Sequence, residues 1–143
     1  MANYYLNLSE RILDQAKLGE DTSLLRKELF YIRTENLESG LSSDALKNMF
    51  WGNIYNAYFL ILKSEQVEDN KIFKIKRVKF FRFVLSLNDI EFGILGTKKI
   101  NLRFYQFSNP FYPSYIKELA VKKFDPNNVP HLIKSTIYTT YRF

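Results

Sequence analysis

The longest apolar pattern in the chain runs from Ser43 to Leu62 (SDALKNMFWGNIYNAYFLIL). At 3.6 residues per turn, one stripe of apolar side chains faces a single side of a helix. The stripe comprises Leu46, Phe50, Ile54, Ala57 and Ile61, and it is widened by Met49, Trp51, Tyr55, Tyr58 and Leu62. Ser42 or Ser43 can cap the start, and Asp44 suits the positive end of the helix dipole. The pattern predicts a buried central helix.

The length of this helix, roughly 20 residues, would also suit a membrane span. Several polar side chains would then lie inside the bilayer, where they are costly: Lys47, Asn48, Asn53 and Asn56. A central helix of a soluble domain is therefore favoured, and no membrane span is expected.

Polar residues and a glycine interrupt the apolar surface of this helix in a regular way. Asn48, Gly52 and Asn56 are spaced i, i+4 and i+8 and share one side, with Asn53 beside them. The glycine allows another backbone to approach, and a buried asparagine must find hydrogen-bond partners. Two interpretations stay open: the asparagines fasten neighbouring segments to the helix, which is favoured, or they line a pocket.

Shorter helical patterns flank the central one. Asn3 to Leu18 is predicted to be a helix that stops at Gly19, and a second helix is predicted from Asp21 or Thr22 to about Arg33. Glu38 to Gly40 is predicted to break the helical pattern. Further on, Pro113 suits the first turn of a helix that runs to about Lys123, and Asp125 to Asn128 is a turn signal.

The stretch Lys71 to Val84 (KIFKIKRVKFFRFV) alternates basic and apolar residues. The favoured interpretation is a half-buried strand pair with a turn or bulge near Arg77–Val78 and a lysine face in water. The alternative is an anion-binding or nucleic-acid surface. Its candidate residues are Lys74, Lys76, Lys79 and Arg82. Ile133 to Phe143 also alternates like a strand, so we expect an α+β fold whose helical half packs on a small antiparallel sheet.

A cap signal follows the basic stretch. Ser86 stands three residues before Asp89, as in a capping box, so a short helix with Ile90, Ile94 and Leu95 on its buried side is predicted. Asp89 and Glu91 are then expected to stabilise the start of this helix through the cap and the helix dipole. Their position alone does not indicate acid–base catalysis.

Composition narrows the classes of function. With 143 residues, of which 46% are hydrophobic, the chain is expected to fold as one domain, residues 1–143. The absence of cysteine excludes disulfides, thiolate catalysis and cysteine metal sites, and the single histidine, His131, excludes a multi-histidine metal site. No cofactor motif is present, and the start of the chain lacks a signal-peptide pattern, so a cytoplasmic location is expected. The net charge of +6 favours anionic partners without identifying one.

Two blocks resemble a known family. FWGNIYNAYFLIL (Phe50–Leu62) looks like the W-x-N-x-Y-N-A helix of the DUF547 family, and LSLNDIEFGILG (Leu85–Gly96) is similar to that family's L-S-L-N-D-I-E-H-G-I-L-R segment. DUF547 is named only as a domain of unknown function, and the resemblance covers about residues 44–126. Phe92 and Gly96 stand where the family has histidine and arginine, and the arginine and two cysteines expected after Asp125 are missing.

The resemblance implies a candidate pocket formed by the polar residues of the two blocks. Its residues would be Trp51, Asn53, Asn56, Asn88, Asp89 and Glu91. We expect a non-catalytic, truncated or diverged family member that acts as a scaffold or binding module. The alternatives are a cysteine-less hydrolase or transferase site using Glu91, His131 and the asparagines, or a basic module that binds anions or nucleic acid. The partner is not indicated by the sequence.

Overall fold

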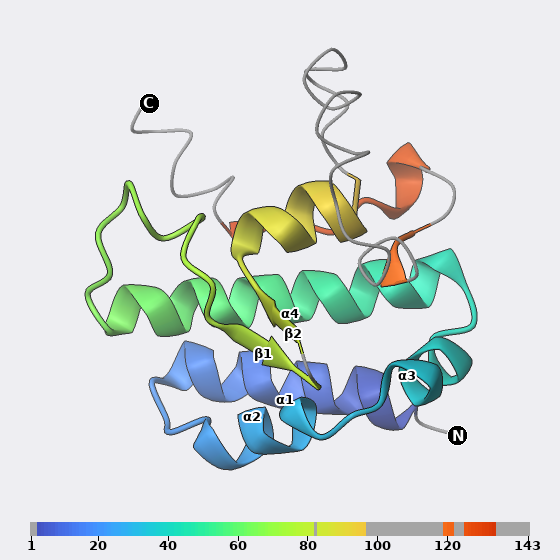
Figure 1. Ribbon diagram of the computed structural model, residues 1–143, viewed down its shortest axis with the longest axis horizontal. Coiled ribbons are helices and arrows are strands. Elements are labelled where there is room, and N and C mark those ends of the chain that lie inside the picture. Colours follow the sequence, from blue (N-terminus) through green and yellow to red (C-terminus); the bar gives the residue numbers. More distant parts are fainter. Residues whose placement is uncertain (1–2, 82, 97–118, 122–124, 134–143) are drawn as a thin grey trace.

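Helices dominate the first half of the chain, and a small hairpin follows them (Figure 1). The structure is a computed structural model that describes residues 3–81, 83–96, 119–121 and 125–133. The four α-helices of this described part are α1 (Tyr4–Leu18), α2 (Ser23–Phe30), α3 (Thr34–Gly40) and α4 (Asp44–Ser64). They are followed by strands β1 (Val78–Phe80) and β2 (Phe83–Leu85), the π-helix η1 (Asp89–Ile94) and the 3₁₀ turn η3 (Pro126–Asn128). The fold is α+β, as predicted.

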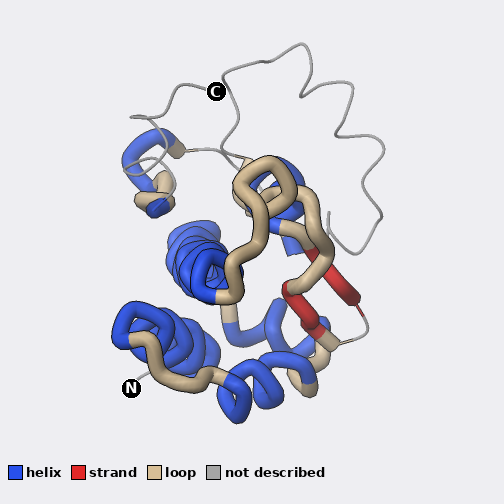
Figure 2. Tube along the Cα trace, turned by 90° about the vertical axis from the view of Figure 1, so that its left-hand side faces the viewer, coloured by secondary structure: helices blue, strands red, loops and turns tan. Residues whose placement is uncertain are grey.

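Helix α4 is the centre of the molecule. The Ser43 hydroxyl caps it by accepting a hydrogen bond from the Leu46 backbone N–H at 3.2 Å, as the sequence predicted. α1 lies beside α4 with its axis roughly parallel, and the end-on view of Figure 2 shows the two helices adjacent. Because α4 is covered on several sides, most of its residues from Lys47 to Leu62 are buried. The predicted buried central helix is confirmed.

Aromatic side chains of α4 fill the core. Trp51 is completely buried, and its ring meets Phe50 and Phe80 edge to face, with centroids 5.0 Å and 5.6 Å apart. Phe59 stacks on Phe73 at 5.8 Å. Since Phe80 belongs to β1, the hairpin is fastened to the central helix by its aromatic face.

The N-terminal helices agree with prediction in part. Gly19 ends α1 in the left-handed conformation at φ 73°, as expected, whereas Asn3, predicted as the first helical residue, caps the helix instead. The predicted second helix up to Arg33 is too long, since α2 ends at Phe30. A separate helix, α3, occupies the region that was predicted to break. Buried Leu37 anchors this helix, whereas Arg33 before it is extended.

The hairpin also differs from prediction. Residues 71–75 form helical turns, in which the Ile75 N–H bonds the Lys71 carbonyl at 3.0 Å. Among the described residues, β1 pairs with β2, with Val78 opposite Leu85, and Phe81 turns the chain at φ 54°. The predicted strand over Lys71–Arg77 and the turn near Arg77–Val78 are therefore wrong. Ile72 and Ile75 have the i, i+3 spacing of a helical turn, which the period-two alternation concealed.

Other predictions fall outside the described residues. These are the strand expected over Ile133–Phe143, beyond Ile133 itself, and most of the helix expected from Pro113. The turn at Asp125–Asn128 is confirmed as η3, in which the Asp125 carboxylate accepts from the Asn127 N–H at 2.9 Å. Among the described helices, none combines the length and the hydropathy that crossing a bilayer requires.

Candidate functional site

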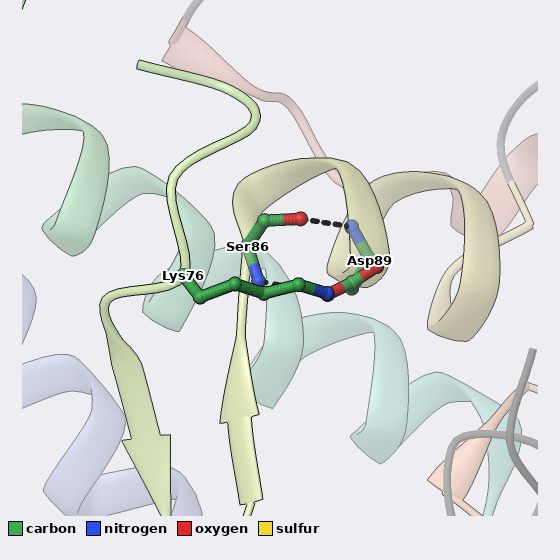
Figure 3. Close-up of polar contacts among 3 residues, drawn as sticks. All are labelled: Lys76, Ser86 and Asp89. Carbon is green, nitrogen blue, oxygen red and sulfur yellow. Dashed lines mark hydrogen bonds and ion pairs between the residues drawn. The ribbon is translucent and has the colours of Figure 1, made fainter. Parts of the chain in front are cut away.

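The second sequence block begins with a reciprocal cap. The Ser86 hydroxyl accepts from the Asp89 N–H at 3.1 Å, and the Asp89 carboxylate accepts from the Ser86 N–H at 2.9 Å. Figure 3 shows the Lys76 ammonium reaching the same carboxylate, with which it forms an ion pair. The predicted capping box is confirmed. Lys76 comes from the turn before β1, so the cap also ties the basic stretch to η1.

The η1 segment presses one acidic side chain against α4. Ile90 and Ile94 are fully buried, as predicted, and η1 closes with the Leu95 N–H on the Ile90 carbonyl at 2.8 Å. Glu91 is 4% exposed and accepts a hydrogen bond from the Tyr55 hydroxyl at 3.3 Å. The two sequence blocks are therefore in contact through a tyrosine and a carboxylate.

Asn56 holds a segment that lies far from it in the sequence. Its amide nitrogen donates to the His131 carbonyl at 2.9 Å, and its amide oxygen accepts from the Ile133 N–H at 2.7 Å. The side-chain amide thus pairs with the backbone on both sides of Leu132, as a neighbouring strand would. The expectation that this asparagine fastens a neighbouring segment is confirmed.

Gly52 lies one helical turn before Asn56 and makes room for the same segment. A Cβ built on Gly52 would lie 2.6 Å from Pro130 Cβ and 3.2 Å from its Cγ. The Lys47 ammonium, on the preceding turn, donates to the Ala120 carbonyl at 3.3 Å. The side of α4 that carries Gly52 and Asn56 is therefore shaped to receive residues 130–133, while Lys47 fastens Ala120 to the start of the helix.

We expect Gly52→Ala to lower the free energy of unfolding by up to about 2 kcal/mol. Overpacking against Pro130 costs about 1–3 kcal/mol, and the gain in helix propensity returns only about 1 kcal/mol. Urea unfolding would measure the change. Pro130→Gly removes the clashing atoms, so in that background Gly52→Ala should become neutral or stabilising. An equal loss in both backgrounds would contradict the close approach.

The other predicted residues have different neighbours. The Asn53 amide donates to the Ser9 hydroxyl at 3.1 Å and so binds α1. Asn88 is half-buried, and its backbone N–H bonds the Phe73 carbonyl at 3.0 Å. Trp51 faces the hairpin, and its indole N–H has no hydrogen-bond partner among the described residues. Asn53 and Asn56 therefore serve two different neighbours of α4, α1 and the 131–133 segment.

His131 was the candidate partner of Glu91 in a cysteine-less site. Its side chain is exposed, and its backbone carbonyl is the group that Asn56 binds. Glu91 is buried against Tyr55. The two side chains thus occupy different environments, one in water and one in the core.

The basic candidates are also dispersed. Lys74 is exposed, Lys76 is held by Asp89, and Arg82 lies outside the described residues. Lys79, on β1, lines a hollow of about 320 Å³ that we call the basic hollow. The other residues that line the basic hollow are Arg26, Lys27, Phe30, Tyr58 and Arg77. Arg26, Lys27, Phe30 and Tyr58 were not predicted, because α2, α4 and the hairpin are far apart along the chain. Arg77 lies in the predicted basic stretch but was not among its candidates.

A larger hollow of about 580 Å³ lies against α1 and α2. Tyr4 lines it and donates from its hydroxyl to the Glu28 carboxylate at 3.0 Å. Partial burial and this carboxylate raise the pKa of Tyr4 above its usual value. Apart from Glu28, the only charged residue that lines this larger hollow in the described part of the chain is Lys27, which also lines the basic hollow. The larger hollow therefore offers fewer charged groups to a ligand.

Comparison with known proteins adds no relative. No family model, curated protein or solved structure matches the chain.

Proposed function

We propose that the chain is a DUF547-like binding module without catalytic activity, in which the polar residues of the two sequence blocks hold the fold together. The observation that carries this proposal is the pair of hydrogen bonds of the Asn56 side chain, which donates to the His131 carbonyl and accepts from the Ile133 N–H. A side chain whose donor and acceptor are both engaged by backbone is used for architecture. The Asp89 cap on Ser86 supports the same role for the second block.

The competing proposal is a hydrolase or transferase site that uses Glu91. A general base must reach the proton that it removes, directly or through one water. Glu91 is buried at the α4–η1 contact, where the Tyr55 phenol donates to it, whereas the side chain of His131 is exposed. This arrangement favours a structural role for the carboxylate.

A substrate screen tests the absence of catalysis. The purified chain should show no turnover of thioester, peptide or amide substrates that depends on Glu91. The variants to compare are Glu91→Gln and, as a matched control with the same change of charge, Glu38→Gln at an exposed position of α3. Turnover that Glu91→Gln abolishes and Glu38→Gln preserves, with both variants folded by circular dichroism, would refute the proposal.

A further inference from the structure

Four cationic side chains from separate elements surround the basic hollow. Arg26 and Lys27 belong to α2, Lys79 lies in β1, and Arg77 directly precedes that strand. Helix α2 and the hairpin pack against one another, which brings the two pairs together (Figure 1). Like charges repel, so gathering four of them around one concavity is costly unless an anion joins them.

Both arginines are held in position by neighbours that leave part of each guanidinium available. Arg26 Nε donates to the buried Thr22 hydroxyl at 2.9 Å, and Arg77 Nη2 donates to the Glu65 carboxylate at 2.7 Å. Glu65 offsets one positive charge, so three of the four remain. Within the described residues, neither Lys27 nor Lys79 forms an ion pair, and both are exposed. Guanidiniums held in position beside exposed ammoniums suit a phosphate group.

The remaining lining is aromatic. Tyr58 is only 3% exposed, and burial raises its pKa to about 12, although Arg26 and Arg77 act in the opposite direction. Its hydroxyl therefore keeps its proton at neutral pH and can donate a hydrogen bond. Phe30 is 39% exposed at the hollow and meets Tyr31 edge to face, so part of its ring is left for a stacking partner.

We propose that the basic hollow binds a small phosphorylated molecule that carries a planar ring, a nucleotide being the simplest example. The phosphate would lie between the α2 and hairpin cations, and the ring would pack on Phe30. A volume of about 320 Å³ suits one such unit. A nucleic-acid strand instead requires a series of stacking side chains along a groove. This proposal names a ligand class for the binding module proposed above.

Isothermal titration of the full chain at low salt tests the proposal, with ADP, pyrophosphate, adenosine and an oligothymidylate as probes. ADP should bind, pyrophosphate more weakly and adenosine hardly at all. Arg77→Gln and Lys79→Gln should each weaken ADP binding about tenfold, as loss of a charge-assisted hydrogen bond predicts. Phe30→Ala should weaken ADP and leave pyrophosphate unchanged.

The matched control is Lys74→Gln, which removes the same charge from an exposed position of the basic stretch outside the hollow. It should change the ADP affinity less than twofold. No binding of ADP or pyrophosphate overturns the proposal, as does an equal loss in Lys74→Gln and Lys79→Gln. Oligothymidylate binding tighter than ADP binding, with equal sensitivity to both lysines, would also overturn it. Turnover that depends on Glu91 would refute the non-catalytic role and leave these binding results unaffected.

Discussion

Trp51→Ala is expected to lower the free energy of unfolding by about 3–5 kcal/mol, the loss that removal of a large buried aromatic ring causes. The indole is fully buried and fills the contact between α4 and β1, where it meets Phe80. Its removal opens a cavity between the central helix and the hairpin. Urea-induced unfolding followed by circular dichroism would measure the loss.

Met49→Ala is the matched control, because Met49 lies on the same helix and is 48% exposed. Its effect should remain within about 0.5 kcal/mol. Trp51→Phe separates volume from hydrogen bonding: the indole N–H has no partner among the described residues, so the loss should be clearly smaller than for alanine. Equal losses for Trp51→Ala and Met49→Ala would mean that the tryptophan does not join the hairpin to α4.

The unusual sequence of α4 follows from its surroundings, because each side of the helix contacts a different part of the fold. Asn53 contacts α1, and Trp51 contacts the hairpin. Tyr55 contacts the η1 segment, and Asn56 contacts residues 131–133. A helix covered on so many sides must be apolar nearly all round. The few polar side chains then occur where one neighbour presents a matching donor or acceptor.

Features that depend on local sequence were predictable. The caps at Ser43 and Ser86 are satisfied by backbone groups three residues away, so the residue order alone indicates them. The length of α4 follows from a long helical pattern that no proline breaks. The turns before β1 were mistaken for a strand, because in a short segment alternating lysines can mimic period two while Ile72 is buried in a helical turn.

Features that depend on tertiary packing were beyond the sequence. The spacing of Asn48, Gly52 and Asn56 indicated a shared side of α4. The sequence around these residues does not indicate that the segment containing Pro130 and His131 packs on that side. The basic hollow depends on tertiary packing even more clearly, because α2 contributes two of its cations and its sequence contains no motif that indicates a binding site. Charge patterning within the hairpin indicated Lys79 alone of its lining residues.

Asn56→Ala is expected to lower the free energy of unfolding by about 2–3 kcal/mol. Each of its two hydrogen bonds contributes about 0.5–1.5 kcal/mol, and the peptide groups left behind are partly buried, which adds a desolvation cost. Asn53→Ala is the matched control: it removes the same side chain from the neighbouring face and breaks one described bond, so it should cost about 1 kcal/mol.

A local measurement distinguishes loss of the Asn56 contact from general weakening. The Ile133 N–H donates to the Asn56 amide oxygen, so its hydrogen exchange should accelerate in Asn56→Ala by more than the change in global stability explains. In Asn53→Ala, exchange at Ile133 should follow global stability alone. Asn56→Asp retains an acceptor for the Ile133 N–H but cannot donate to the His131 carbonyl, so it should restore protection at Ile133 without restoring full stability. Unchanged exchange at Ile133 in Asn56→Ala would show that the segment is held by Gly52 and Pro130 packing, and that the asparagine contributes little to it.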